Sequence, residues 1–370
     1  MMRLAWRNLV HSKARLSISV GGVGLAMLLI LALDAVFTGA ERTATAYIDR
    51  SRADILVSQA GVRNMHMASS SLPAGLEDEL EAVPGVASAT PILYLTNVIV
   101  AGGERSLAYV IGLPPAAEAG GPWQVADGSA DIGPGEAVID EGVAEVSGVG
   151  VGDRVEILGR QFRLVGVSRG TATFVNSVAF IPIDEFASLR GNPGTVSFYF
   201  LKVEPDARPE QVARRVEAEV EEITGQTREE FSRQERKVIR DMSTDILAIM
   251  NLVGLLIGLA VMALTVYTST HARRAEFGLL KALGASQGQL YRAVLGQAAI
   301  SVVLGFGLAL TLTLGLTALA PRLSTNMAME IDPASLAKVA AMAAVNAAAS
   351  ALLPIRQIAG LDPASVFRRR

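Results

Sequence analysis

The stretch that decides the fold is HARRAEFGLLKALGASQGQLYR, His271–Arg292, which lies between two long uncharged runs, Ile246–Thr270 and Ala293–Pro321. It carries four Lys or Arg residues against a single acid, Glu276. Apolar residues recur in it at helical spacing, which predicts a short amphipathic helix that breaks at Gly284. Two flanking runs of membrane-spanning length place this helix at a membrane surface, and its basic excess predicts the cytoplasmic side.

The composition indicates a membrane protein with a large soluble part. Of the 370 residues, 51% are hydrophobic and only 19% are charged, a balance too apolar for an ordinary soluble protein. The chain has no cysteine, which excludes disulfides, thiolate metal sites and cysteine nucleophiles. Motifs for a phosphate-binding loop, a serine hydrolase or a zinc protease do not occur. We therefore expect that the chain is not an enzyme and holds no metal.

The hydropathy pattern predicts four transmembrane α-helices plus an α+β extracytoplasmic domain inserted between spans 1 and 2. The expected segments are a cytoplasmic amphipathic helix (1–16), span 1 (17–39), the α+β domain with a C-terminal stalk helix (40–243), span 2 (244–270), a cytoplasmic helical segment (271–292), span 3 (293–320), an outer loop (321–334), span 4 (335–354) and a cytoplasmic tail (355–370). The alternative for the N-terminus is a signal peptide. Its apolar run Leu16–Leu33 is longer than the usual hydrophobic region of such a peptide, which favours a retained span.

The distribution of charge predicts the orientation. Segments 1–16, 271–292 and 355–370 together hold twelve Lys and Arg against two acids, whereas residues 41–245 hold 19 Lys and Arg against 31 Asp and Glu. The positive-inside rule then puts both termini in the cytoplasm and the acidic domain outside the plasma membrane. The acidity of that domain argues against a nucleic-acid partner.

Residues 41–245 show mixed periodicity, which predicts an α+β domain. Gly159-Arg160 is expected to turn a tight hairpin, and Thr227 with Glu230 has the spacing of a capping box. The helix opening there is expected to run without a break into span 2. The expected strands are 53–59, 93–100, 106–113, 154–158, 161–167, 177–182 and 195–203, and the expected helices are 75–82, 209–223 and 227–241.

Three further features are candidates for a site. Gly254 and Gly258 have GxxxG spacing and predict a close helix–helix contact, within the chain or in a dimer. Asp34, near the outer end of span 1, either lines a substrate route or lies at the membrane interface. Met65-His66-Met67 has side chains that bind soft metals or haem iron, but a surface loop is the simpler interpretation.

Two stretches, RRAEFGLLKALGAS (Arg273–Ser286) and LDPASVFR (Leu361–Arg368), resemble the FtsX-like/MacB-type permeases of ABC transporters. Within the outer domain, VPGVASATP (83–91), VGDRVEILGRQFRLVGV (151–167) and FIPIDEF (180–186) are similar to that family in a more general way. The resemblance covers essentially the whole chain. It implies a permease subunit that pairs with a separate ATPase, with two copies of each in the working assembly.

In this family the segment after the second span docks on the ATPase, so the resemblance implies a coupling helix over 271–292. Carried over by motif, the docking residues are Arg273, Arg274, Glu276, Leu280, Lys281, Leu283 and Gly284. Alternatively, the arginines only set the topology and the leucines pack on neighbouring spans. ATP and Mg would bind the partner ATPase, and the permease itself would bind no cofactor.

The resemblance implies mechanotransmission: closure of the ATPase pair moves the coupling helices, and the stalk relays that movement outward. The cargo would be an amphiphilic or lipophilic compound taken from the outer leaflet or the exterior, as in the family's lipoprotein-release, drug-efflux and haem-export members. A different class of function is a scaffold, similar to the cell-division members, whose outer domain signals to an extracytoplasmic partner such as a wall hydrolase. A membrane-tethered enzyme is a third alternative, but no catalytic constellation supports it.

Overall fold

The computed structural model describes the backbone of residues 13–172, 177–272, 274–323 and 328–359. The expected helix over 1–16, Arg273 and the motif Leu361–Arg368 lie wholly or mostly outside the described residues. The chain forms two compact units. The α+β unit comprises Gly39–Met242 with Pro321–Ala328, and the helical unit comprises Met1–Thr38, Ser243–Ala320 and Met329–Arg370.

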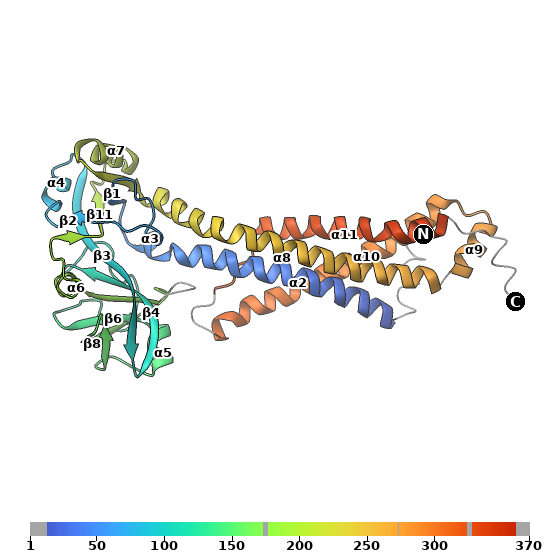
Figure 1. The fold of residues 1–370 in the computed structure, drawn as a ribbon, viewed down its shortest axis with the longest axis horizontal. Helices are drawn as coiled ribbons and strands as arrows, with labels where there is room; N and C mark the ends of the chain where they lie inside the picture. The colour runs from blue at the N-terminus through green and yellow to red at the C-terminus, as the bar shows by residue number, and fades with distance from the viewer. Residues whose placement is uncertain (1–12, 173–176, 273, 324–327, 360–370) are drawn as a thin grey trace. The chain divides into compact units, whose positions relative to one another are not determined.

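One half of the α+β unit is a four-stranded antiparallel sheet in the order β12-β1-β11-β3. Two short helices, α4 and α7, cover it and give the chain order βαββαβ (Figure 1). Helix α7 turns Val212, Ala213 and Val216 into the core, because these apolar positions fall on one helical face. The elements are β1 (Ile55–Gln59), α4 (Glu77–Glu81), β3 (Val86–Ala101), β11 (Phe198–Val203), α7 (Pro209–Glu219) and β12 (Ile223–Thr227).

The other half is a closed six-stranded barrel, inserted between β3 and β11. The ring closes because β7 pairs with both β3 and β8, so the long strand β3 belongs to both halves. Its interior is filled by aliphatic side chains and two phenylalanines, Phe162 and Phe186. The remaining ring strands are β4 (Glu104–Leu113), β6 (Glu136–Asp140), β7 (Arg154–Ile157), β8 (Arg160–Ser168) and β9 (Ser177–Pro182).

Shorter elements complete the α+β unit. Strand β5 pairs with β8, and β2 and β10 form a two-stranded sheet of their own. These elements are α3 (Ala46–Arg50), β2 (Leu72–Pro73), β5 (Val125–Gly128), α5 (Glu141–Ser147), α6 (Ile183–Arg190) and β10 (Thr195–Val196). The expected α+β class is confirmed, and a strand lies at each expected place, except that the strand expected over 195–203 is divided into β10 and β11, which belong to different sheets. The sequence patterns did not predict β2, β5, β6 and β12.

Two local expectations need correction. The turn between β7 and β8 is Leu158-Gly159 rather than Gly159-Arg160, because Ile157 pairs with Arg160. Both turn residues have positive φ, 53° and 78°, as a two-residue hairpin turn requires. The helix expected over 209–223 ends at Glu219, and Ile223–Thr227 is instead the edge strand β12, which is rich in β-branched residues.

The capping box at the start of α8 (Arg228–Ala272) is confirmed. The Thr227 backbone N–H donates to Glu230 Oε2 at 3.1 Å, and the Glu230 N–H donates to Thr227 Oγ1 at 3.2 Å. Helix α8 then continues for 45 residues without interruption, as expected. Its first turns are tied to the preceding helices by ion pairs from Arg236 to Asp49 and from Arg240 to Glu41.

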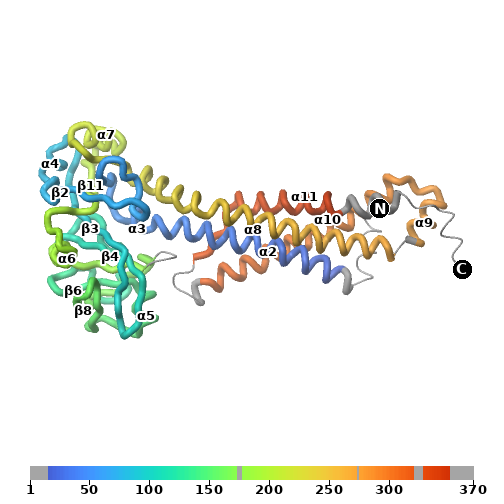
Figure 2. The backbone as a smooth tube through the Cα atoms, in the orientation of Figure 1, coloured from blue at the N-terminus to red at the C-terminus, as the bar shows by residue number. Residues whose placement is uncertain are grey.

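Four long helices form the helical unit: α2 (Lys13–Ala44), the second part of α8, α10 (Gln287–Leu323) and α11 (Pro333–Ala359). They run alongside one another around a common apolar core (Figures 1 and 2). Within the described residues, α2, α8 and α10 are long and apolar enough to cross a membrane. Helix α11 contains Lys338 and Asn346 and is not among these three, so a fourth span stays a prediction.

Candidate functional site

The candidate site begins with α9 (Arg274–Ala282), the short helix between α8 and α10. It ends in a Schellman motif in which Gly284 has a φ of +92°. The Ala285 N–H donates to the Leu280 carbonyl at 2.9 Å, and the Gly284 N–H donates to the Lys281 carbonyl at 3.1 Å. Glycine adopts this left-handed conformation without a Cβ penalty. The break expected at Gly284 is therefore confirmed.

Directly after this break a second capping motif starts α10. The Ser286 N–H donates to Gln289 Oε1 at 3.1 Å, and the Gln289 N–H donates to Ser286 Oγ at 3.4 Å. This reciprocal pair satisfies two backbone donors at the helix start. The turn between the two helices is thus held from both sides, which gives the segment a defined shape. The Ser286–Gln289 spacing could have been found in the sequence.

Helix α9 has an anchored side and an open side. The side chain of Phe277 packs against the core of the helical unit. In contrast, Leu279, Leu280 and Leu283 are 49%, 38% and 76% exposed, and Glu276 is exposed beside them. Leu279 and Leu280 precede Leu283 by four and three residues, so the three leucines form an apolar face of α9 that the rest of the described chain does not bury. We call Glu276, Leu279, Leu280 and Leu283 the α9 surface.

The structure brings several of the sequence-predicted docking residues together on this helix and its cap. Glu276, Leu280 and Leu283 belong to the α9 surface, Lys281 is half-buried, and Gly284 ends the helix. Leu279 was not among the predicted residues, although it follows the same helical spacing. The side chains of the two predicted arginines, Arg273 and Arg274, lie outside the described residues.

The GxxxG pair on α8 packs within the chain. A Cβ on Gly254 would come 2.7 Å from Ile30 Cγ1, and one on Gly258 would come 2.8 Å from Asn346 Nδ2. The missing side chain at Gly254 therefore lets α2 pack closely on α8. The missing side chain at Gly258 does the same for α11, and also for α2, whose Ala26 lies 3.5 Å from that Cβ position. The predicted packing role agrees with these contacts, whereas a role in a dimer stays a prediction.

Helix α2 uses glycines for two more close contacts. A Cβ on Gly24 would lie 3.2 Å from the Gly305 carbonyl oxygen of α10. A Cβ on Gly22 would meet Val261 of α8 well inside contact distance. Small residues let membrane helices approach closely. Together with Gly254 and Gly258, these positions bring α2 against α8 and α10, and α8 against α11.

Asp34 of α2 is buried and forms an ion pair with Lys338 of α11, with Asp34 Oδ2 lying 2.5 Å from Lys338 Nζ. The two partners differ in exposure: the aspartate side chain is 3% exposed and the lysine side chain is 40% exposed. The acid is thus enclosed in the helical unit and the base reaches it from the outside. Sequence patterns singled out Asp34 but could not supply its partner.

Met65-His66-Met67 lies in the connection between β1 and β2, and its side chains have different surroundings. Met65 is buried and Met67 is exposed. His66 Nδ1 contacts Oε1 of Glu235, a fully buried residue of α8, and the Met65 N–H donates to Glu235 Oε2 at 2.8 Å. The imidazole ring also packs on Tyr109 at 4.9 Å between ring centroids. This geometry ties the connection to α8.

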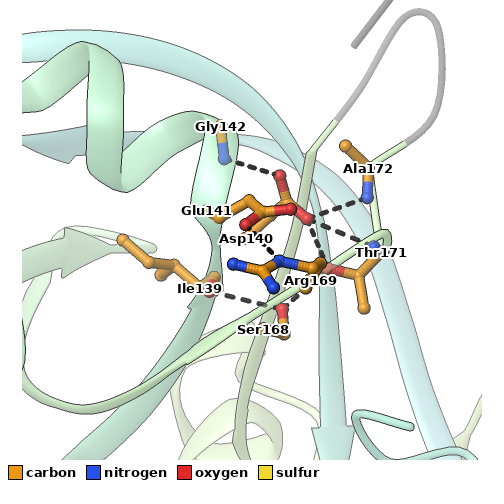
Figure 3. A network of polar contacts seen from close by, with 8 residues as sticks. All are labelled: Ile139, Asp140, Glu141, Gly142, Ser168, Arg169, Thr171 and Ala172. Atoms are coloured by element: carbon orange, nitrogen blue, oxygen red, sulfur yellow. Dashed lines mark hydrogen bonds and ion pairs between the residues drawn. The ribbon is translucent and has the colours of Figure 1, made fainter. Parts of the chain in front are cut away.

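The carboxylate of Asp140, at the end of β6, accepts four hydrogen bonds (Figure 3). Its Oδ1 caps α5 by accepting the Gly142 N–H at 2.9 Å. Its Oδ2 accepts the Thr171 hydroxyl at 2.6 Å and the backbone N–H groups of Thr171 and Ala172 at 3.2 and 3.0 Å. Burial raises the pKa of Asp140, and these hydrogen bonds oppose that rise. Every donor is supplied by the chain itself, so we interpret the network as structural.

A helical unit with membrane-length helices and a separate α+β unit define an integral membrane protein with a large soluble domain. Two family models match the chain: the MacB-like periplasmic core domain over residues 16–219 and the FtsX-like permease C-terminal over residues 248–363. The first alone covers more than half of the 370 residues. The chain belongs to the FtsX/MacB-type permeases, membrane subunits of ABC transporters that work with a partner ATPase.

Similar proteins carry the same description. The chain is 24% identical over 372 residues to the ABC transporter permease Rv2563 of Mycobacterium tuberculosis strain H37Rv, covering 99% of both chains. The same figures hold for the permease Mb2592 of Mycobacterium bovis. Another permease of M. tuberculosis, Rv0987, is 24% identical over 337 residues, and the match spans 84% of this chain but only 37% of that longer relative.

Two solved structures are similar to part of the chain. The periplasmic region of MacB from Actinobacillus actinomycetemcomitans is 12% identical, with a TM-score of 0.39, over 50% of this chain and 92% of that one. The extracellular domain of the transporter YknZ from Gram-positive bacteria is 15% identical, with a TM-score of 0.36, over 47% of this chain and all of that one. The family assignment does not rest on them.

Proposed function

We propose that this permease couples ATP hydrolysis by its separate ATPase to the export or extraction of an amphiphilic or lipophilic substrate by mechanotransmission. The α9 surface is the docking site for the ATPase, in the cytoplasm, where both termini also lie. Two permease copies form a homodimer in the working assembly. Movement delivered at α9 passes along α8 to the α+β unit outside the membrane.

The α9 surface is the observation that supports this proposal most directly. A loop that only reversed the chain direction would have no need for three exposed leucines beside an acid. Apolar side chains at the centre of a contact, with charged residues at its rim, are the usual anatomy of a protein–protein interface. Helix α9 is also anchored to the helical unit by Phe277 and closed by the Gly284 cap. A push on it would therefore move the helical unit rather than only bend a loop.

Helix α8 supports the transmission step. It is one uninterrupted helix of 45 residues, and its first turns are fastened to α3 and α2 through Asp49 and Glu41. His66 adds a further link from the β1–β2 connection to Glu235. A continuous hydrogen-bonded helix passes displacement along its axis with little loss. The few charges inside the apolar helices agree with a cargo that does not cross through a polar conduit.

The docking role is tested by Leu283→Asp and Glu276→Arg in the full chain, co-expressed with the ATPase. We expect each to weaken co-purification of the two subunits by about tenfold or more, because a buried charge or a reversed one costs at least about 1.4 kcal/mol at such a contact. The control is Leu189→Asp, an equally polar change at an exposed leucine of α6. Unchanged assembly and ATP turnover in both α9 variants would rule out this docking site.

An assay of ATP hydrolysis by the reconstituted complex distinguishes transport from the scaffold function, because different molecules would stimulate the ATPase in the two cases. Stimulation by hydrophobic compounds supports the transport proposal. Dependence on a soluble exterior protein, without any response to such compounds, would replace it by the scaffold function.

A further inference from the structure

Asp34 is a buried acidic residue of the helical unit. Its α2 neighbours Ile30, Leu31 and Ala35 are buried as well. An ionised carboxylate in such surroundings needs a positive partner, because the loss of its hydration is not otherwise offset. Lys338 supplies that charge at 2.5 Å. Without it, the folded protein would hold an uncompensated anion.

The positive partner is held less firmly than the negative one. The Lys338 side chain is 40% exposed, and a lysine has a long flexible stem that can carry its ammonium group to the polar surface. Within the described residues, the Lys338 ammonium is the one polar partner of Asp34 Oδ2. A different cation could satisfy the same carboxylate.

The surroundings determine which cation fits. Asp34 is buried, and no metal-binding group of three or more acids or histidines occurs among the described residues, whereas hydrated metal ions require several oxygen ligands. An organic cation with a diffuse charge and an apolar body needs only one counter-charge and gains from apolar contact. Two further acids, Glu330 and Asp332, belong to the more accessible connection before α11, where the Glu330 backbone N–H donates to the Ala35 carbonyl at 3.0 Å.

We propose that Asp34 binds a lipophilic organic cation that displaces Lys338. This inference rests on the proposed function, because the cation would be the amphiphilic cargo. The lysine acts as a built-in competitor that neutralises Asp34 when no cargo is present. Binding then consists of an exchange of counter-ions, in which the lysine moves to the surface and no covalent bond changes.

The test uses the full chain with its ATPase in lipid nanodiscs and measures equilibrium binding of tetraphenylphosphonium. Lys338→Gln removes the competitor, so we expect about tenfold tighter binding. Asp34→Asn removes the counter-charge, and we expect saturable binding to be lost. Tetraphenylborate, an anion of the same shape, should show neither effect. Asp332→Asn, a nearby acid outside the pair, is the control and should leave the affinity unchanged.

A second measurement on the unmodified chain covers the case in which Lys338→Gln does not fold. Acylation of Lys338 by a membrane-permeant amine reagent is followed by mass spectrometry. Tetraphenylphosphonium should increase this labelling, because it releases the ammonium group from Asp34. The proposal would be overturned if tetraphenylphosphonium left the labelling of Lys338 unchanged. It would also be overturned if Lys338→Gln and Asp34→Asn changed the affinity for tetraphenylphosphonium in the same direction. Intact ATPase association in these variants would show that only this inference, and not the docking proposal, had failed.

Discussion

At the scale of single residues, two buried aspartates show how different partners give a carboxylate different roles. Asp140 accepts four hydrogen bonds, three of them from the segment Thr171–Ala172. Asp34 Oδ2 has one polar partner among the described residues, the Lys338 ammonium. A fully satisfied carboxylate fixes its neighbours in place, whereas one balanced by a single flexible cation can exchange that cation.

The Asp140 network leads to a stability prediction. Asp140→Ala leaves buried donors of Gly142, Thr171 and Ala172 unpaired, and we expect a local loss of roughly 2–3 kcal/mol. Hydrogen exchange of the full chain, followed over residues 136–172, should show faster exchange in the variant. Asp131→Ala, at an exposed acid in the connection before β6, is the control. Equal exchange in both variants would contradict the structural role assigned to Asp140.

At the scale of helices, α2 packs closely against α8 at glycines, where even a Cβ atom would clash with the other helix. A Cβ added to Gly254 would meet Ile30 of α2. A Cβ added to Gly315 of α10 would point into open space. Both glycines lie inside long helices. An alanine therefore has the same intrinsic helix propensity at the two sites, and only the packing differs.

Gly254→Ala should accordingly lower the melting temperature of the detergent-solubilised chain. Overpacking costs about 1–3 kcal/mol, which exceeds the gain in helix propensity of about 1 kcal/mol. Gly315→Ala should leave the melting temperature unchanged or raise it, since only the propensity gain applies. If Gly254→Ala changed the oligomeric state but not the stability, the glycine would serve a dimer contact instead of the contact with Ile30.

At the scale of the whole molecule, the charge asymmetry predicts on which side of the membrane each part lies. The chain has no cysteine, so a single introduced thiol reports its own position. We expect Val146→Cys, on α5 of the α+β unit, to react with an impermeant maleimide in intact cells. Ala282→Cys, on α9, should react only after the membrane is permeabilised. Both residues are exposed, so access through the membrane decides the result. Labelling of α9 from outside would contradict the proposed topology.

Local backbone structure was predictable from the sequence wherever a few neighbouring residues determine it. The capping box at Thr227 and the break at Gly284 follow from side chains within a single turn, and both are confirmed. The edge strand β12 was not expected, because Ile223–Thr227 falls between the two helices expected over 209–223 and 227–241, and its strand conformation is completed by pairing with β1. The second capping pair, Ser286 with Gln289, was overlooked although its spacing is visible in the sequence.

The sequence by itself determined the division into apolar helices and an acidic α+β domain, the helix broken at Gly284 and the family resemblance. These properties depend on composition and on short-range periodicity, which a linear chain displays directly. Only the tertiary structure decided that the barrel closes through β7, that Gly254 admits α2, and that Asp34 pairs with Lys338. Each of these joins residues far apart in the chain, and such a contact forms only when packing repays the entropy of bringing distant segments together.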